Sequence, residues 1–451
     1  MEVTIERILP GGLGLAHADG RTIMVALATP GDRLRVRVDR AKGSVSFAVI
    51  EEIITPSPHR VVPPCPYFGR CGGCDFQQMN YQAQLDAKAE IIKDCLRRIA
   101  RIENIPDFQI TPAPNPWHYR SRAQWQYDAV RQRLGYFESG SRNICDVAEC
   151  AVLAPQLQNT LETLRAQMTS GSLPEARDFR AVVGDEVVSI SSAVRGSSPT
   201  LGSPAAQPGW GETVREGSAG RGSSPTVREG SDLKMKRREV CDITRTIHGE
   251  SYRFNAESFF QANDGLLPGL IDAAIGDAKG ETALDLYCGV GLFTLPLARR
   301  FSQVIAVESD PAAAKFARDS LAKAGLTNAE IATRDVGVWL DDVKHHDLSR
   351  LSESSAAALK DQIDFVLLDP PRVGAESRVI AGILGLKPRR ISYVSCDPAT
   401  MARDLKKLIA GGYQLASMSA FDMFPQTHHV EIVVHLIMDS VAGTPAEISS
   451  R

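Results

Sequence analysis

Three of the nine cysteines stand close together in the segment CPYFGRCGGC, at Cys65, Cys71 and Cys74. Thiolates at this spacing bind either a tetrahedral zinc ion or an iron–sulfur cluster, and both centres need a fourth ligand from elsewhere in the chain. An odd number of unevenly spaced cysteines in a chain of 451 residues does not fit a disulfide framework. The spacing alone therefore predicts a metal centre and leaves zinc and iron–sulfur open.

A second group of residues has the pattern of a nucleoside site. Asp285 and Tyr287 precede Gly289 and Gly291 in DLYCGVG, at the end of an apolar run. Glycines at a strand-to-helix turn let a ligand approach the backbone, and ligands bind at the carboxyl ends of strands in α/β sheets. Glu308 ends the next apolar run, about 20 residues on, where an acidic side chain accepts hydrogen bonds from ribose hydroxyls. The combination predicts a nucleoside cofactor.

Three further reactive side chains lie at the ends of later apolar runs. Asp369 begins Asp-Pro-Pro-Arg, and the two prolines fix the backbone just beyond the strand, although a purely structural turn is the alternative. Cys396 follows YVS and is a candidate nucleophile, although a cysteine at a strand end is more often packed structure. Glu431 opens the last apolar run and could act as a base.

The elements that must hold these residues begin at residue 282, where apolar strands alternate with helices. Strands are expected at 283–286, 303–307, 365–368, 390–394 and 430–437. This alternation predicts an α/β, doubly wound sheet of parallel strands, with an antiparallel addition at its end. The reactive residues then meet at one edge of the sheet.

The first half of the chain has a different pattern. Short strands punctuated by glycine and proline over the first sixty residues predict a small β-barrel. An amphipathic helix is expected at 81–101, and a basic and aromatic run follows at 117–136. Residues 191–231 repeat RGSSPT and TVREGS and are rich in Gly, Ser and Pro, which predicts a flexible low-complexity insertion. The expected basic face of the barrel carries Arg33, Arg35, Arg37, Arg40 and Lys42, with a merely solvated strand face as the alternative.

The overall composition excludes several classes of protein. With 43% apolar and 23% charged residues the chain is not collagenous, a coiled coil or wholly disordered. The 51 Lys+Arg against 54 Asp+Glu give a net charge of −3, which argues against a histone-like binder but not against a local basic groove. No apolar stretch reaches the ~20 residues of a membrane span, and no signal peptide is visible, so a cytoplasmic location is expected.

Five separated motifs, in this order, resemble those of the uracil-5 RNA methyltransferases, the family that forms 5-methyluridine in tRNA and 23S rRNA. They are SFFQAN at 258–263, DLYCGVG at 285–291, DPPR at 369–372 with Gly374, SCDP at 395–398 with Thr400 and Arg403-Asp404, and FPQTHHVE at 424–431. The first sixty residues resemble a TRAM domain, a small RNA-binding barrel. The clustered cysteines resemble the iron–sulfur motif of the family's rRNA-modifying branch.

The resemblance implies a Rossmann-like methyltransferase sheet and S-adenosylmethionine as the methyl donor. Leu292 and Asp397 stand where the family more often has asparagine. The cofactor-binding residues that the family pattern assigns are Gln261, Tyr287, Gly289, Glu308, Asp335 and Asp369.

The resemblance also implies a mechanism and a second cofactor. The Cys396 thiolate would attack carbon 6 of uracil, carbon 5 would take the methyl group, and Glu431 would remove the proton from carbon 5. A 4Fe-4S cluster would use the three clustered thiolates and Cys150, with Cys145 as the competitor for the fourth position.

The chain is expected to divide into several parts. These are a TRAM-like or OB-like RNA-binding barrel at 1–58, an α+β middle domain with the cysteine knot at 59–250, the methyltransferase domain at 251–440 and a tail at 441–451. The helix at 81–101 is a candidate to pack on the catalytic domain. RNA is the expected partner, 23S rRNA before tRNA, with no membrane and no protein partner for a monomeric chain. A base amino-methyltransferase and a non-catalytic RNA-binding protein are the alternatives.

Overall fold

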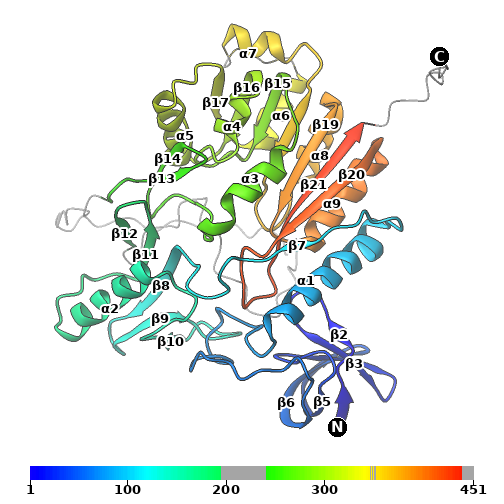
Figure 1. Ribbon diagram of the computed structural model, residues 1–451, viewed down its shortest axis with the longest axis vertical. Helices are drawn as coiled ribbons and strands as arrows, with labels where there is room; N and C mark the ends of the chain where they lie inside the picture. Colours follow the sequence, from blue (N-terminus) through cyan, green and yellow to red (C-terminus); the bar gives the residue numbers. More distant parts are fainter. Residues whose placement is uncertain (194–239, 346, 348, 350–351, 439–451) are drawn as a thin grey trace, which may run out of the picture.

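The computed structural model describes residues 1–193, 240–345, 347, 349 and 352–438. The predicted tail, and the predicted insertion beyond residue 193, lie outside the described residues. Figure 1 shows the N-terminal strands at one end, the middle sheet beside them, and the large C-terminal sheet with its helices at the other end.

The N-terminal part is a six-stranded sheet in the order β1-β5-β6-β4-β3-β2. Alternating apolar side chains, among them Ile23 and Leu34, form its core. Strand β1 also contacts β3, so the sheet curls around this core. The strands are β1 (Glu2–Thr4), β2 (Arg7–Ile8), β3 (Gly14–Ala18), β4 (Arg21–Val25), β5 (Arg33–Lys42) and β6 (Val45–Thr55).

The basic side chains of β5 point outward, but most of them are paired. Arg33 binds Glu2 at 2.9 Å, Arg37 approaches Glu51 at 3.4 Å, and Arg35 binds Glu52. Arg40 stacks over the Phe47 ring at 4.3 Å. The expected basic face is therefore largely neutralised by acidic side chains of the neighbouring strands.

A long helix follows the cysteine segment. The Asn80 side chain caps α1 (Tyr81–Cys95) by accepting from the amide of Ala83 at 2.9 Å. The expected helix at 81–101 instead changes to one π-helical turn, η1 (Leu96–Ala100), and ends at Arg101, whose φ is +64°. The apolar face of α1 and η1 packs against α9 (Pro398–Ala410) in one shared core.

The middle part is a five-stranded antiparallel sheet in the order β10-β9-β8-β11-β12, with α2 (Pro155–Thr169) packed on it. Trp125 and Tyr127 are buried in its core, and Tyr119 is buried where its hydroxyl donates to the carbonyl of Pro425 at 3.0 Å. These members of the basic and aromatic run are therefore core residues. The strands are β8 (Arg122–Asp128), β9 (Arg133–Phe137), β10 (Ile144–Asp146), β11 (Asp178–Val183) and β12 (Val188–Ala193), followed by the hairpin β13 (Ile243–Ile247) and β14 (Glu250–Phe254).

The C-terminal part is an eight-stranded sheet in the order β17-β16-β15-β18-β19-β21-β20-β7. Strands β15 to β19 are parallel and β21 is antiparallel, which confirms the predicted α/β doubly wound class. Strand β7 comes from the middle of the chain and joins the edge beside β20. The strands are β7 (Ile110–Thr111), β15 (Gly280–Leu286), β16 (Phe301–Glu308), β17 (Ala329–Thr333), β18 (Phe365–Leu368), β19 (Arg390–Ser395), β20 (Tyr413–Phe421) and β21 (Glu431–Met438).

Helices pack against both faces of this sheet (Figure 1). They are η2 (Asp264–Leu266), α3 (Leu267–Ile275), α4 (Thr294–Ala298), α5 (Pro311–Lys323), α6 (Val336–Lys344), α7 (Glu353–Ala358), α8 (Ser377–Leu386) and α9. Among the described residues, no helix combines the length and the apolar character that crossing a membrane requires.

Candidate active site

The reactive residues of the C-terminal sheet lie at the carboxyl ends of its parallel strands. The chain runs outward from β15 to β17 and then returns to β18 on the other side of β15. Neighbouring helices on the two sides of such a switch point diverge and leave a ligand crevice. The glycine turn follows β15 and Asp369 follows β18, so both flank this position.

The glycine turn after β15 is hydrogen-bonded to the side chain of Glu308. Tyr287, Gly289 and Gly291 have φ values of +66°, +55° and +91°, a left-handed conformation that glycine adopts without strain. A side chain at Gly291 would lie 3.2 Å from Leu295, so this position also needs a glycine. The Glu308 carboxylate accepts from the amides of Gly289 at 2.9 Å and of Asp310 at 2.7 Å. These bonds fix the carboxylate beside the turn.

Two carboxyl groups lie at the switch point, Asp285 fully buried and Asp369 half-buried. Burial raises the pKa of Asp285 to about 7, although Thr294 donates a hydrogen bond to it at 2.6 Å. Its other oxygen, Oδ1, has no hydrogen-bond partner among the described residues. Burial and the charge of Asp285 raise the pKa of Asp369 to about 7. Buried carboxyl groups of this kind suit a cationic ligand, because a nearby positive charge favours their ionised form.

Asp335 follows β17, and one of its two carboxylate oxygens already accepts hydrogen bonds. Its Oδ1 caps α6 by accepting from the amide of Val338 at 3.0 Å, and it also accepts from Arg378 at 2.9 Å. No hydrogen bond to Oδ2 is found among the described residues, so this oxygen is available to a ligand. Two other predicted cofactor residues lie in buried surroundings. Burial raises the pKa of Tyr287, and the charge of Asp335 acts in the same direction. Gln261 is buried on the segment before η2.

Cys396 and Glu431 are neighbours across two antiparallel strands. Ser395 at the end of β19 pairs with Ile432 of β21, so the next step along the pair brings Cys396 opposite Glu431. Burial and the Glu431 carboxylate raise the pKa of the Cys396 thiol, and Arg372 acts in the opposite direction. Burial and Asp369 raise the pKa of Glu431 far above its usual range, again against Arg372. A thiol, a carboxyl group and one cation therefore face one another.

His429 belongs to the same group of residues and was missed at the level of sequence. Burial holds its pKa well below the usual range, and His428 and Arg372 act in the same direction. Its Nε2 lies 3.4 Å from Nη1 of Arg372. The signal was present in the motif FPQTHHVE, where His429 stands two residues before Glu431.

Helix α9 supports the loop that carries Asp369 and Arg372. Thr400 donates to the carbonyl of Arg372 at 3.1 Å, and Arg403 donates to the carbonyl of Val373 at 3.1 Å. Buried Asp404 accepts from the amide of Ala375 at 2.9 Å. Asp397, at the position where asparagine was expected, caps α9 by accepting from the amide of Thr400 at 2.7 Å. The motif residues around Cys396 thus position the neighbouring loop.

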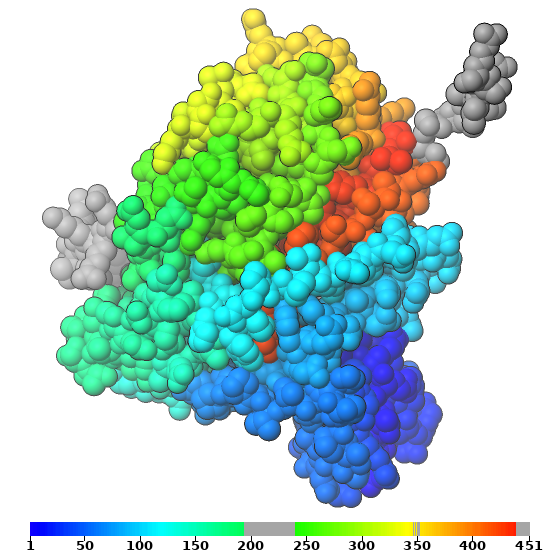
Figure 2. All heavy atoms as spheres, in the orientation of Figure 1, coloured from blue at the N-terminus to red at the C-terminus, as the bar shows by residue number. Residues whose placement is uncertain are grey.

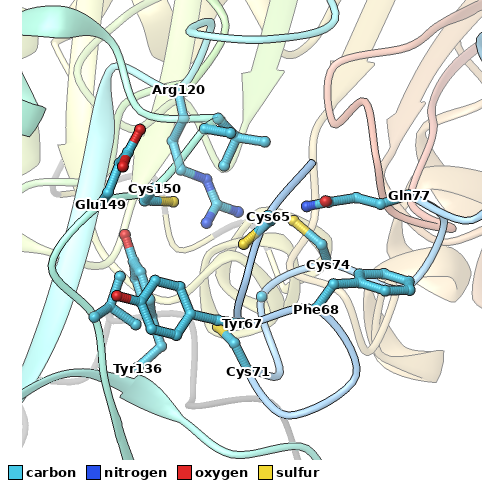
Figure 3. Close-up of a pocket in the computed structure, with 14 residues that line it drawn as sticks. Cys65, Tyr67, Phe68, Cys71, Cys74, Gln77, Arg120, Tyr136, Glu149 and Cys150 are labelled. Atoms are coloured by element: carbon cyan, nitrogen blue, oxygen red, sulfur yellow. The ribbon is translucent and has the colours of Figure 1, made fainter. Parts of the chain in front are cut away.

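A second site lies in the middle part of the chain. Cys65, Cys71, Cys74 and Cys150 line one pocket, and all nine cysteines are free of disulfides. Figure 3 shows the thiols of Cys65, Cys74 and Cys150 and the guanidinium of Arg120 converging on the same space. The competitor Cys145 is instead buried in β10, where its sulfur receives a hydrogen bond from Arg70 at 3.2 Å.

Burial opposes the ionisation of three of these thiols. Burial raises the pKa of Cys71 to about 12 and also raises the pKa of Cys65 and Cys74. Arg120 lies among cysteines and tyrosines and forms no ion pair with a carboxylate in the described part of the chain. No group of three or more His, Cys, Asp or Glu among the described residues is arranged to hold a single metal ion.

Comparisons with known proteins agree with the geometry of the sheet edge. The profile of the tRNA (uracil-5-)-methyltransferase family matches residues 231–439. An RNA methyltransferase of Thermosynechococcus vestitus is 32% identical over 97% of both chains. A 23S rRNA (uracil(1939)-C(5))-methyltransferase of Pectobacterium atrosepticum is 31% identical over 98% of this chain and 94% of that protein.

A solved structure shares the fold of almost the whole chain. The tRNA (uracil-54, C5)-methyltransferase of Pyrococcus abyssi, in complex with S-adenosyl-L-homocysteine, covers 97% of this chain and all of its own with a TM-score of 0.67 and 24% identity. The sheet edge, the family profile and the full-length relatives lead to one conclusion. The chain belongs to the uracil-5 RNA methyltransferase family and is an S-adenosylmethionine-dependent RNA (uracil-5-)-methyltransferase.

Proposed function

We propose that this enzyme methylates carbon 5 of a uridine in 23S rRNA through a covalent bond between Cys396 and carbon 6 of the base. The observation that carries the proposal is the pairing of β19 with β21, which brings Cys396 opposite Glu431 beside Asp369. A nucleophile for carbon 6 and a base for the carbon 5 proton are the two groups that the reaction needs.

The proposed reaction is an addition to the base followed by an elimination. The Cys396 thiolate adds to carbon 6, and the electrons of the carbon 5–carbon 6 double bond move toward carbon 4 and its oxygen, forming an enolate. Carbon 5 of this enolate attacks the methyl group, and S-adenosylhomocysteine leaves. Glu431 then takes the proton from carbon 5, the double bond forms again, and the Cys396 thiolate is expelled.

Arg372 and the buried carboxyl groups set the protonation states for these steps. The thiol must lose its proton before it attacks, and burial opposes that loss. Arg372 is the cation that favours the ionised form of both Cys396 and Glu431. A carboxylate with a raised pKa is a stronger base, so the burial of Glu431 favours removal of the carbon 5 proton.

The cofactor site is proposed at the switch point of the sheet. S-adenosylmethionine supplies a methyl group on a positively charged sulfonium. Asp285 and Asp369 are the carboxyl groups that would complement its positive charges. Glu308 would accept from the ribose hydroxyls, and the available Oδ2 of Asp335 would accept from the adenine amino group. Gln261, Tyr287 and Gly289 complete the proposed set.

The thiol pocket is proposed to hold a 4Fe-4S cluster. Four thiols around one pocket fit a cluster, which spreads its ligands over several iron atoms, better than one zinc ion, which needs four sulfurs about 2.3 Å from a single centre. Arg120 supports the assignment, since a half-buried cation that forms no ion pair with a carboxylate among the described residues matches four ionised thiolates. When bound, the cluster would link the Cys65–Cys74 segment to Cys150.

The proposed target rests on the relatives that span the whole chain. Two of them, at 30% and 31% identity, are named as 23S rRNA (uracil(1939)-C(5))-methyltransferases. A TRAM-type role for the curled N-terminal sheet is part of the same proposal. The competing target is tRNA, the substrate named for the Pyrococcus abyssi enzyme with the same fold.

The test uses RNA that contains 5-fluorouridine. Fluorine at carbon 5 cannot leave as a proton does, so a covalent complex that survives denaturation is expected with S-adenosylmethionine. Cys396→Ala should abolish this complex, whereas Cys241→Ala, at an exposed cysteine, should retain it. Glu431→Gln should accumulate the complex even on ordinary uridine RNA. If wild-type enzyme methylates a uridine RNA but forms no complex on its 5-fluorouridine form, the covalent mechanism is wrong.

The target is tested by mass spectrometry of RNA from a strain that lacks the gene. Loss of one 5-methyluridine from 23S rRNA, restored by the wild-type chain but not by Cys396→Ala, is the expected result. Loss from tRNA with intact 23S rRNA would replace the proposed target by the competing one.

A further inference from the structure

We propose that Asp75 and Gln84 are positioning residues for the catalytic base, acting through the loop at 422–428. The inference rests on the proposed role of Glu431, which begins β21 three residues after this loop ends. In Figure 1 the loop between β20 and β21 leaves the sheet and reaches the segments coloured light blue and cyan. In Figure 2 a small orange-red patch emerges between atoms of those colours.

The loop contains a strained residue. Gln426 has a φ of +68° and is only 2% exposed. A residue other than glycine persists in this conformation only when its surroundings hold it there. The residues that hold it come from far away in the sequence, so the loop depends on another part of the chain for its shape.

Asp75 binds the loop from one side through both its backbone and its side chain. Its amide, and the amide of Phe76, donate to the carbonyl of Gln426 at 3.1 and 3.0 Å. Its carboxylate accepts from the amide of His428 at 2.9 Å and contacts Nδ1 of the same residue. Gly12 lies over this pair, because a side chain there would come within 2.9 Å of Asp75 and 3.2 Å of His428.

Gln84 of α1 binds Gln426 from the other side of the loop. Its Nε2 donates to Oε1 of Gln426 at 3.0 Å, and its Oε1 accepts from the amide of Gln426 at 2.9 Å. Lys88, one turn further along the helix, is buried against Asp422 and donates to the carbonyl of Phe424 at 3.1 Å. The loop is therefore held by direct hydrogen bonds along most of its length.

The consequence for catalysis follows from the short distance along the chain. Only His429 and Val430 separate His428 from Glu431, and His429 lies beside Arg372. A displacement at His428 is therefore passed on to the base and to the cation that faces it. A misplacement of about 1 Å in a catalytic group can cost about 100-fold in rate. Cys396 comes from β19 and is not part of this loop, so nucleophilic attack depends less on these contacts.

The experiment separates the two halves of the reaction in full-length protein. Asp75→Ala and Gln84→Leu remove the side-chain bonds, Asp75→Asn keeps an acceptor for the amide of His428, and Asp86→Ala is an exposed control on α1. In Asp75→Ala and Gln84→Leu, turnover on uridine RNA should fall about 10- to 100-fold. A covalent complex should accumulate on that RNA. Complex formation with 5-fluorouridine RNA and S-adenosylmethionine affinity should stay within about twofold of wild type. Asp75→Asn should recover most of the turnover.

The outcomes distinguish positioning from general support of the fold. Asp75 follows Cys74 directly, whereas Gln84 does not line the thiol pocket, so a matching result for Gln84→Leu argues against an effect through that pocket. If complex formation falls as much as turnover, or if turnover is unchanged in both variants, the positioning role is wrong. Glu431→Gln serves as the reference, because its failure to accumulate the complex would refute the proposed base itself and not the inference about Asp75 and Gln84.

Discussion

The buried Asp285 makes the stability of the enzyme depend on pH in a way that one substitution should remove. Its pKa is about 7 in the folded chain against a usual value of 3.8, and burial is the main cause. Each unit of difference corresponds to about 1.4 kcal/mol, so the carboxyl group accounts for roughly 4 kcal/mol. Because the folded chain binds this proton more tightly, the contribution of Asp285 to stability is greatest below pH 3.8 and falls as pH rises to about 7.

The test compares wild type with Asp285→Asn in the absence of S-adenosylmethionine. The amide can still accept from Thr294, but its NH2 group would replace Oδ1, which has no partner among the described residues. That unpaired donor should cost about 1–3 kcal/mol at every pH. The variant is therefore expected to lose less stability than wild type between pH 5 and pH 8. Urea denaturation followed by circular dichroism at each pH measures the free energy of unfolding.

S-adenosylmethionine provides the control for this reasoning. A bound cation should favour ionised Asp285, so a saturating concentration should reduce the loss of stability with pH in wild type more than in the variant. An equal dependence on pH in both proteins without the ligand would refute the argument. Asp285 would then already be ionised at pH 5 in the folded chain.

Three further substitutions test other parts of the site. Glu308→Ala removes the proposed acceptor of the ribose hydroxyls, and calorimetry should show S-adenosylmethionine binding weakened about 10- to 100-fold, whereas unchanged affinity would contradict the assignment. Cys150→Ser should lower the iron content of anaerobically purified protein below about four per chain while Cys145→Ser retains it, and the reverse result would make Cys145 the fourth ligand. Gly374→Ala places a methyl group 2.5 Å from Arg403 at a φ of +77°, so single-turnover methylation should fall with little change in S-adenosylmethionine affinity, and an unchanged rate would argue against the support from α9.

The sheet could be predicted from sequence because its strands are short apolar runs separated by helices. Asp285, Asp369 and Cys396 end consecutive inner strands, and parallel strands bring their carboxyl ends to one edge. The position of Glu431 next to Cys396 was harder to predict. Glu431 becomes its neighbour only through the antiparallel register of β21 on β19, and a register between segments so far apart is set by packing and not by local pattern.

The exposure of the basic and aromatic side chains could not be predicted in the same way. Arg33, Arg35 and Arg37 share one face of β5 because side chains alternate along a strand. Whether they are free depends on which acidic residues the flanking strands bring opposite them, and β1 and β6 bring Glu2, Glu51 and Glu52. Trp125 and Tyr127 likewise fit a stacking surface by type, yet their strand turns them into the middle core. Charge and aromatic content in one segment do not determine exposure.

The sequence suggests a domain boundary at residue 250, but stabilising contacts join the parts of the chain on either side of it. The buried ion pair between Lys88 and Asp422 joins α1 to the loop before β21, and breaking such a pair by removing one partner costs about 3–5 kcal/mol. Strand β7 extends the C-terminal sheet, and the apolar side chains of α1 complete the core beneath α9. The residues that shape the loop before Glu431 thus also bury part of the catalytic core. An N-terminal segment that supplies both functions has to fold together with the methyltransferase sheet, because neither the loop nor that face of the core is complete without it.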